Sequence, residues 1–181
     1  MRLLFVHGGG DEAYSWDRKL ADHLQAALGP TPQLDVPKLD GLEALDWPVV
    51  KRDLGKTLRA LPEGAIVVAH SVGAAAVLKL LADGLDPKLR HLLLLAPPYN
   101  GADSEWGDDD FALPADFAHH LPKVLPITLW HSRDDAIIPV ASAERYRQKL
   151  SQAEVILLDG YGHQFEGSLA FLADAIHGAL K

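Results

Sequence analysis

The chain has 181 residues, a formal net charge of −8 and no cysteine. Its length predicts one domain, residues 1–181, large enough for a full hydrophobic core. The negative charge makes nucleic acid a poor candidate partner, and the lack of cysteine excludes disulfides, thiolate metal sites and a cysteine nucleophile. The apolar runs are too short to span a bilayer, and the first of them runs directly into glycines, unlike a signal peptide. We therefore expect a cytoplasmic protein without membrane contact.

Strand and helix patterns alternate along the chain. Apolar runs bounded by turn residues predict strands at residues 3–7, 33–36, 65–70, 91–96, 127–131 and 154–158. Helical periodicity predicts helices at residues 16–28, 47–61, 72–82, 141–150 and 168–180, with Trp16 and Trp47 on core faces. The stronger strands are apolar throughout, as in sheets covered on both faces. This order predicts an α/β fold with a parallel sheet between two layers of helices.

The clearest motif lies where a predicted strand meets an almost wholly apolar helix. Residues 69–73 read Ala-His-Ser-Val-Gly, the small-x-Ser-x-small pattern of a tight turn that exposes a serine. Ala69 and Gly73 are small enough to face each other across the turn, and the helix N-terminus favours negative charge beside Ser71. Ser71 is the predicted nucleophile. The alternative is a serine that only caps the buried helix.

A serine hydroxyl needs a base to take its proton and an acid to orient that base. His163 lies in a glycine-containing loop after the last predicted strand, and it is the predicted base. Asp134 and Asp135 follow the preceding strand and compete for the role of the acid. The alternatives are an exposed loop histidine and a turn-forming aspartate. The chain order of serine, aspartate and histidine is that of one known class of triad enzymes.

Three consecutive glycines follow the first predicted strand directly. Such a run offers bare backbone N–H groups at the sheet edge, and it resembles the His-Gly-Gly-Gly type of oxyanion loop. Gly9 and Val72 are the expected donors to an oxyanion, and Gly8 and Gly10 are expected to border the substrate. A phosphate loop is disfavoured because neither glycine fingerprint of such loops is present, and a plain turn is the other alternative.

The segment after the fourth predicted strand is long and polar, which is typical of functional or mobile loops. Tyr99 and Trp106 are candidates for lining an acyl pocket under a short cap, although a solvated surface loop is favoured. The acidic run at residues 108–110 lacks the spacing of a calcium loop, so no metal is expected. His70 and His131 end buried strands, and packing is favoured over a role in the site for both.

These motifs together resemble the α/β-hydrolase superfamily over nearly the whole chain. In that family the acid commonly lies four residues before a proline, which selects Asp135, ahead of Pro139, over Asp134. Ala69 departs from the glycine usual at the start of the elbow. The small size is similar to the compact serine hydrolases of the retinoblastoma-binding-protein-nine type. The resemblance implies a three-layer α/β/α sandwich without a large lid, and a mostly parallel six-stranded sheet in the order 2-1-3-4-5-6.

The resemblance also implies an activity. The expected protein is a carboxylesterase-like serine hydrolase that cleaves a small ester, thioester or amide through an acyl-enzyme. It implies a small-molecule acyl substrate, no metal and no organic cofactor. Two alternatives stay open, because this fold hosts many reactions and some inactive members. One is a non-catalytic interaction scaffold, and the other is an acyltransferase that uses the same three residues.

Overall fold

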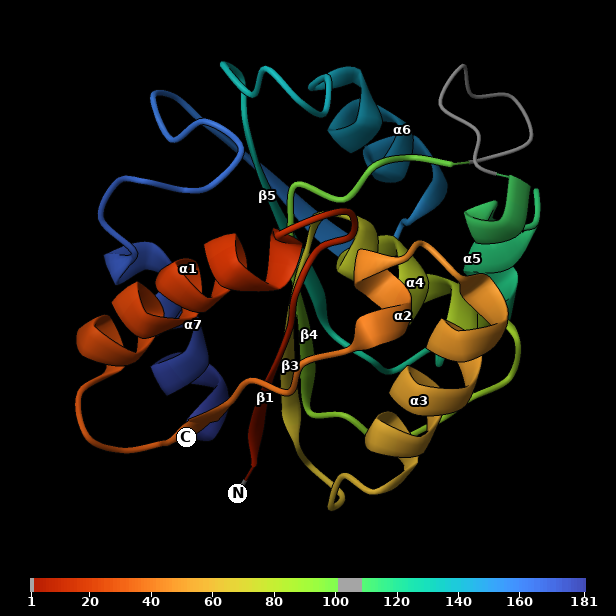
Figure 1. Cartoon of the computed structure of the whole chain (residues 1–181), viewed down its shortest axis with the longest axis horizontal. Helices are drawn as coiled ribbons and strands as arrows, with labels where there is room; N and C mark the ends of the chain where they lie inside the picture. The colour runs from red at the N-terminus through yellow and green to blue at the C-terminus, as the bar shows by residue number, and fades with distance from the viewer. Residues whose placement is uncertain (1, 101–108) are drawn as a thin grey trace.

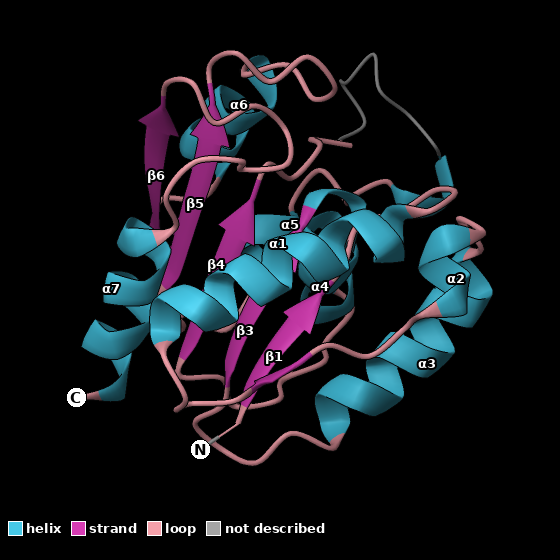
Figure 2. Ribbon diagram, turned by 60° about the vertical axis from the view of Figure 1, so that its left-hand side comes forward, coloured by secondary structure: helices cyan, strands magenta, loops and turns pink. Residues whose placement is uncertain are grey.

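A computed structural model describes residues 2–100 and 109–181 of the chain. The described residues form one sheet, whose strands are β1 Leu3–Val6, β2 Leu34–Asp35, β3 Ile66–His70, β4 His91–Leu95, β5 Ile127–Ser132 and β6 Ala153–Leu158. All neighbouring strands pair in parallel, in the order β2-β1-β3-β4-β5-β6 (Figure 2). The predicted sheet and its strand order are therefore confirmed.

Helices connect the strands. Their bounds are α1 Ala13–Leu28, α2 Asp40–Glu43, α3 Trp47–Arg59, α4 Ser71–Ala82, α5 Phe117–His120, α6 Ala141–Lys149 and α7 Ala170–Leu180, with a 3₁₀ turn at Asp109–Phe111. The sequence did not predict α2, α5 or the 3₁₀ turn, because a single turn is too short to show a helical period. Within the described ranges, no helix has both the length and the apolar character needed to cross a bilayer.

The helices cover the two faces of the sheet in separate layers (Figure 1). On one face, α1 and α7 pack against side chains such as Leu3 and Phe5 of β1. On the other face, α2 to α6 pack against the alternate side chains, among them Leu4 and Val6. Successive residues of a strand point to opposite faces, so the inner strands are mostly apolar and almost fully buried on both sides.

One predicted core residue is exposed. Trp16 is 50% exposed, and its ring lies 4.4 Å from the Nζ atom of Lys19, so its predicted burial is wrong. The buried stripe of α1 runs instead through Asp17 and Leu20, followed by Ala21, Leu24 and Leu28. A charged residue thus takes the inward position that the sequence pattern gave to an aromatic one.

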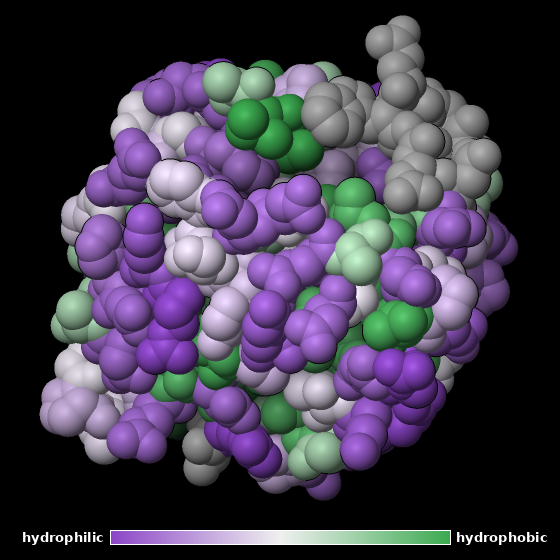
Figure 3. All heavy atoms as spheres, viewed as in Figure 1, coloured by the Kyte–Doolittle hydropathy of each residue, from purple (hydrophilic) through white to green (hydrophobic). Residues whose placement is uncertain are grey.

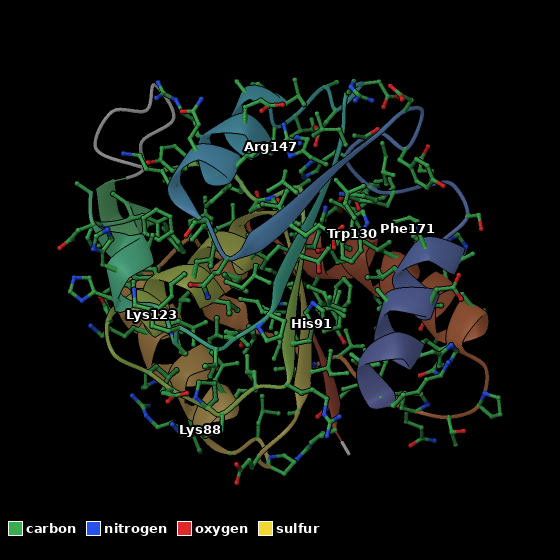
Figure 4. The ribbon with its side chains drawn as sticks, turned by 180° about the vertical axis from the view of Figure 1, so that it is seen from behind. Lys88, His91, Lys123, Trp130, Arg147 and Phe171 are labelled. Carbon is green, nitrogen blue, oxygen red and sulfur yellow. The ribbon has the colours of Figure 1, made fainter. Side chains whose placement is uncertain are left out.

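The edge of the sheet at β6 is less covered than its centre. Residues of β6 are half-buried, except for one that is exposed. Between β5, β6 and α7 lies an open hollow of about 720 Å³, lined in part by Trp130 and Phe171. The two rings lie 5.4 Å apart, one on β5 and one on α7 (Figure 4). An aromatic contact from α7, rather than a further helix, covers this part of the sheet.

The carboxyl ends of the parallel strands all lie at one edge of the sheet, the upper edge in Figure 1. The loops that follow β1, β3, β5 and β6 therefore begin side by side, although they are far apart in the sequence. Ligands of open α/β sheets bind outside this edge. The fold accordingly gathers the glycine loop, the predicted nucleophile, the two aspartates and the predicted base in one place.

Candidate active site

Ser71 stands on a strained turn between β3 and α4. Its φ angle is 50°, a left-handed conformation that is costly for a residue with a side chain. A Cβ atom added at Gly73 would lie 2.0 Å from the carbonyl oxygen of His7, so the turn requires glycine there. Ala69 is fully buried, and its methyl group is accommodated where glycine is usual. These features are those of a nucleophile elbow.

The close approach at the elbow predicts a stability effect. Gly73→Ala is expected to lower the free energy of unfolding by about 1–3 kcal/mol or more, because the new methyl group must displace the backbone of His7. Gly178→Ala in α7 is the matched control, since no atom lies within 4 Å of a Cβ added there. That control should keep stability or raise it by about 0.5–1 kcal/mol. Urea unfolding compares the two, and equal effects would contradict the prediction.

The imidazole of His163 lies between Ser71 and Asp135. Its Nε2 atom is 3.1 Å from Ser71 Oγ, and its Nδ1 atom is 2.7 Å from Asp135 Oδ2. A carboxylate can only accept, so Nδ1 carries the proton and Nε2 is free to accept from the serine hydroxyl. The structure thus brings the predicted nucleophile, base and acid into one hydrogen-bonded row.

Asp135 is held in its ionised form. Its side chain is fully buried, and its Oδ1 atom accepts from the backbone N–H groups of Ile137 and Ile138, both at 2.8 Å. Burial raises the pKa of Asp135, but the hydrogen bonds from His163 and these two amides more than offset burial and leave the pKa below its ordinary value. The carboxylate therefore faces the imidazole as an oriented anion.

The glycine loop presents one unengaged N–H group beside the elbow. The N–H of Gly8 donates to Asp17 Oδ2 at 2.6 Å, and that of Gly10 donates to the carbonyl oxygen of Leu42 at 3.1 Å. Within the described parts of the chain, the N–H of Gly9 has no such acceptor. A Cβ atom added at Gly9 would lie 3.0 Å from Cβ of Val72, so the two predicted oxyanion donors are neighbours.

Comparison with known proteins bears on this arrangement. The family model described as serine hydrolase matches residues 3–168, which is most of the chain. The chain belongs to the serine hydrolase family. Comparison with curated protein sequences gives no match. The narrower similarity to the retinoblastoma-binding-protein-nine type stays a prediction.

Solved structures resemble this serine hydrolase in fold. The ydeN gene product from B. subtilis has a TM-score of 0.73 and 18% identity, with 99% of each chain covered. The esterase domain of a Rhodothermus marinus protein has a TM-score of 0.68 and 18% identity, with 98% of this chain and 85% of that chain covered. A hydrolase of the alpha/beta superfamily from Xanthomonas campestris has a TM-score of 0.58 and 24% identity, with 98% and 91% covered. These likenesses show a shared fold.

The second aspartate of the serine hydrolase has a different task from Asp135. Asp134 is exposed, and its Oδ1 atom accepts from the hydroxyl of Ser132 and from the backbone N–H groups of Gly160 and Gly162, the latter two at 3.1 and 3.3 Å. Asp134 thus anchors the backbone of the loop that leads to His163. The sequence suggested only a local turn, because these partners lie far along the chain and meet it through the sheet.

A second buried pair of aspartate and histidine lies beside the site. His70 Nδ1 is 2.9 and 2.8 Å from Oδ1 and Oδ2 of Asp17, and both residues are 1% exposed. His70 Nε2 is 3.0 Å from the carbonyl oxygen of His163. From the sequence, packing was favoured for His70, and Asp17 was not among the candidate site residues. The available signal was a carboxylate at the position three before Leu20 on an otherwise apolar stripe.

The stability that this pair contributes is expected to depend on pH. Burial lowers the pKa of His70, but interactions chiefly with Asp17 leave it above its ordinary 6.5; burial raises the pKa of Asp17, but His70 leaves it below its ordinary 3.8. The stabilisation that comes from protonated His70 is complete below pH 6.5 and is lost as the pH rises through the folded-state pKa of His70. The stabilisation that comes from ionised Asp17 is complete above pH 3.8 and is lost as the pH falls through the folded-state pKa of Asp17. Urea unfolding should show the largest deficit of Asp17→Asn relative to wild type between these values. A deficit independent of pH would contradict this.

The remaining site candidates fall in different places. Tyr99 is 3% exposed and packs edge-on against Tyr146, with ring centroids 5.2 Å apart. A contact between Tyr99 and the substrate stays a prediction. Trp106 lies outside the described residues. His131 is fully buried, and its Nε2 atom donates to the carbonyl oxygen of Ile138 at 2.8 Å. His131 therefore braces the loop that carries Asp135.

Proposed function

We propose that this serine hydrolase cleaves a small carboxylic ester through an acyl-enzyme on Ser71. His163 is the general base and acid, and Asp135 orients its imidazole. The observation that carries the proposal is the row of hydrogen bonds from Ser71 Oγ through His163 to Asp135, at 3.1 and 2.7 Å. A serine with a packing or capping role alone needs no such row.

Acylation and deacylation each pass one proton through His163. Ser71 Oγ attacks the ester carbonyl carbon while its proton passes to His163 Nε2, and the carbonyl oxygen becomes an oxyanion. The imidazolium is stabilised by the Asp135 carboxylate at Nδ1. The carbon–oxygen bond to the alcohol then breaks, and His163 returns the proton to the departing oxygen. In deacylation, water attacks the acyl-serine with His163 as base, and the acid and free Ser71 are released.

The backbone N–H groups of Gly9 and Val72 are the proposed oxyanion donors. Gly9 supplies the unengaged N–H group of the glycine loop, and Val72 supplies that of the first turn of α4. The helix N-terminus adds partial positive charge in the same direction. Each such donor typically contributes about 3 kcal/mol to the transition state.

Exposed apolar side chains near the site favour an apolar acyl group. Leu45 is 39% exposed, and one of its methyl carbons would lie 2.6 Å from a Cβ atom added at Gly9, so it borders the proposed oxyanion site. Ile137, two residues after Asp135, is 56% exposed. In the space-filling view, apolar residues lie among the polar ones near the upper edge of the molecule (Figure 3).

We further propose that one domain, residues 1–181, carries this whole activity.

Labelling with a fluorophosphonate tests the proposal. The probe phosphonylates only an activated serine, so intact mass and peptide mapping should show one adduct, located on Ser71. The same preparation should turn over p-nitrophenyl acetate. A folded wild-type protein without adduct and without turnover on a panel of esters would overturn the proposal in favour of a non-catalytic scaffold.

A further inference from the structure

We propose that Asp17 and His70 are a positioning pair, which fixes the oxyanion loop and the base relative to Ser71. The inference rests on the proposed function. Asp17 holds the oxyanion loop through the N–H group of Gly8, and His70 holds the base loop through the carbonyl oxygen of His163. The hydrogen bond between Asp17 and His70 joins the two halves.

The partners of His70 determine its charge. One ring nitrogen faces the carboxylate of Asp17 and the other faces the backbone carbonyl oxygen of His163, and neither partner has a hydrogen to donate. Both ring nitrogens must therefore carry hydrogens, which makes His70 an imidazolium. The charged groups that face it are Asp17 from α1 and Asp135 from the loop after β5, and the ring of His163 lies beside it. The raised pKa of His70 and the lowered pKa of Asp17 agree with an ion pair.

Stability alone does not explain a charged pair at this place. A buried ion pair pays a large desolvation cost, and apolar residues of similar volume often serve as well or better. The rest of the buried stripe of α1 is apolar, with Leu20, Ala21, Leu24 and Leu28. Asp17 and His70 direct their hydrogen bonds to Gly8, to His163 and to each other. What the pair adds is a fixed geometry for two loops of the site.

The geometry matters because each anchored group is next to a reacting group. Gly8 precedes Gly9, whose N–H group is the proposed oxyanion donor. His70 precedes Ser71, and its ring centroid lies 4.8 Å from that of His163, at an angle of 46°. Displacing a catalytic group by about 1 Å can lower a rate by about 10²-fold. The Asp17 carboxylate thus helps to fix the position of Gly9 through Gly8, and the positions of Ser71 and His163 through His70.

The test compares Asp17→Asn and His70→Gln with wild type in the hydrolysis of p-nitrophenyl acetate. Each variant should lower kcat by about 10–100-fold with little change in KM, because the placement of reacting groups is lost and binding is kept. The double variant should lose no more than the worse single variant, because the two residues act as one unit. Asp22→Asn is the matched control, since Asp22 lies on the same helix in an exposed ion pair with Arg18. The control should keep the wild-type kcat.

A spectroscopic measurement on the wild type distinguishes a charged pair of Asp17 and His70 from a neutral, packed histidine. Nitrogen-15 NMR of the histidine rings should show both nitrogens of His70 protonated from pH 5 to pH 8. In Asp17→Asn the ring should become neutral within this range. If a variant fails to fold, this wild-type spectrum still decides, because a neutral His70 ring would overturn the pair.

The other outcomes are equally decisive. Folded Asp17→Asn and His70→Gln variants with wild-type kcat would overturn the inference. A loss that is seen in KM alone, or a double variant whose loss is the product of the two single losses, would also overturn it. Failure of the proposed function looks different, because the wild type itself would then show neither turnover nor an adduct on Ser71. In that case a charged His70 would show only that Asp17 and His70 form a structural ion pair, and the positioning role would be rejected.

Discussion

Ser71→Ala is expected to lower kcat for p-nitrophenyl acetate by about 10³-fold or more. Alanine has no hydroxyl to form the acyl-enzyme, so only the oxyanion donors and substrate binding remain to assist attack by water. The fluorophosphonate adduct should disappear in the same variant. Alanine keeps the Cβ atom, so the backbone strain at Ser71 is unchanged and only the hydrogen bond between Oγ and His163 is lost; the thermal midpoint should therefore change little.

The control for this experiment is Ser151→Ala. Ser151 lies in an exposed turn between α6 and β6, away from the carboxyl edge of the sheet. It should keep the wild-type kcat and the adduct. Turnover by a purified, folded Ser71→Ala variant at close to the wild-type rate would show that another residue is the nucleophile.

Asp135→Asn is expected to lower kcat by about 10³- to 10⁴-fold. An asparagine amide can donate a hydrogen bond to Nδ1 of His163, which favours the tautomer with the proton on Nε2. In that tautomer the imidazole cannot accept the proton of Ser71. The backbone N–H groups of Ile137 and Ile138 can still bind the remaining amide oxygen, so the loop should keep its shape.

Asp134→Asn makes the same chemical change one residue earlier and serves as its matched comparison. The amide oxygen of asparagine can still accept from Gly160 and Gly162, so the loop before His163 stays anchored, although more weakly. We expect a loss in kcat of no more than about 10-fold, since the imidazole keeps its own carboxylate. The reverse ranking of the two variants in steady-state kinetics would mean that Asp134 is the acid.

Much of the architecture followed from local patterns. The apolar strands and the helices between them predicted a parallel sheet, because only a sheet covered on both faces calls for strands without polar alternation. The elbow was also readable, since a strained turn that approaches β1 closely tolerates only small residues, and Gly73 with Ala69 meets that condition. The short elements α2 and α5 were missed because four residues carry no periodic signal.

The sequence by itself determined which residue types stand at the carboxyl edge of the sheet, since chain order and strand direction fix which loops meet there. It placed Ser71, His163 and an aspartate together on that basis. The α/β-hydrolase resemblance selected Asp135 over Asp134, and in the structure Asp135 faces the imidazole. Only the tertiary structure decided that Asp134 holds the base loop and that Asp17 reaches His70. Side-chain partners drawn from different elements depend on how α1 and the loops pack against the sheet. That packing is set by contacts between residues far apart in the chain, which no local pattern records.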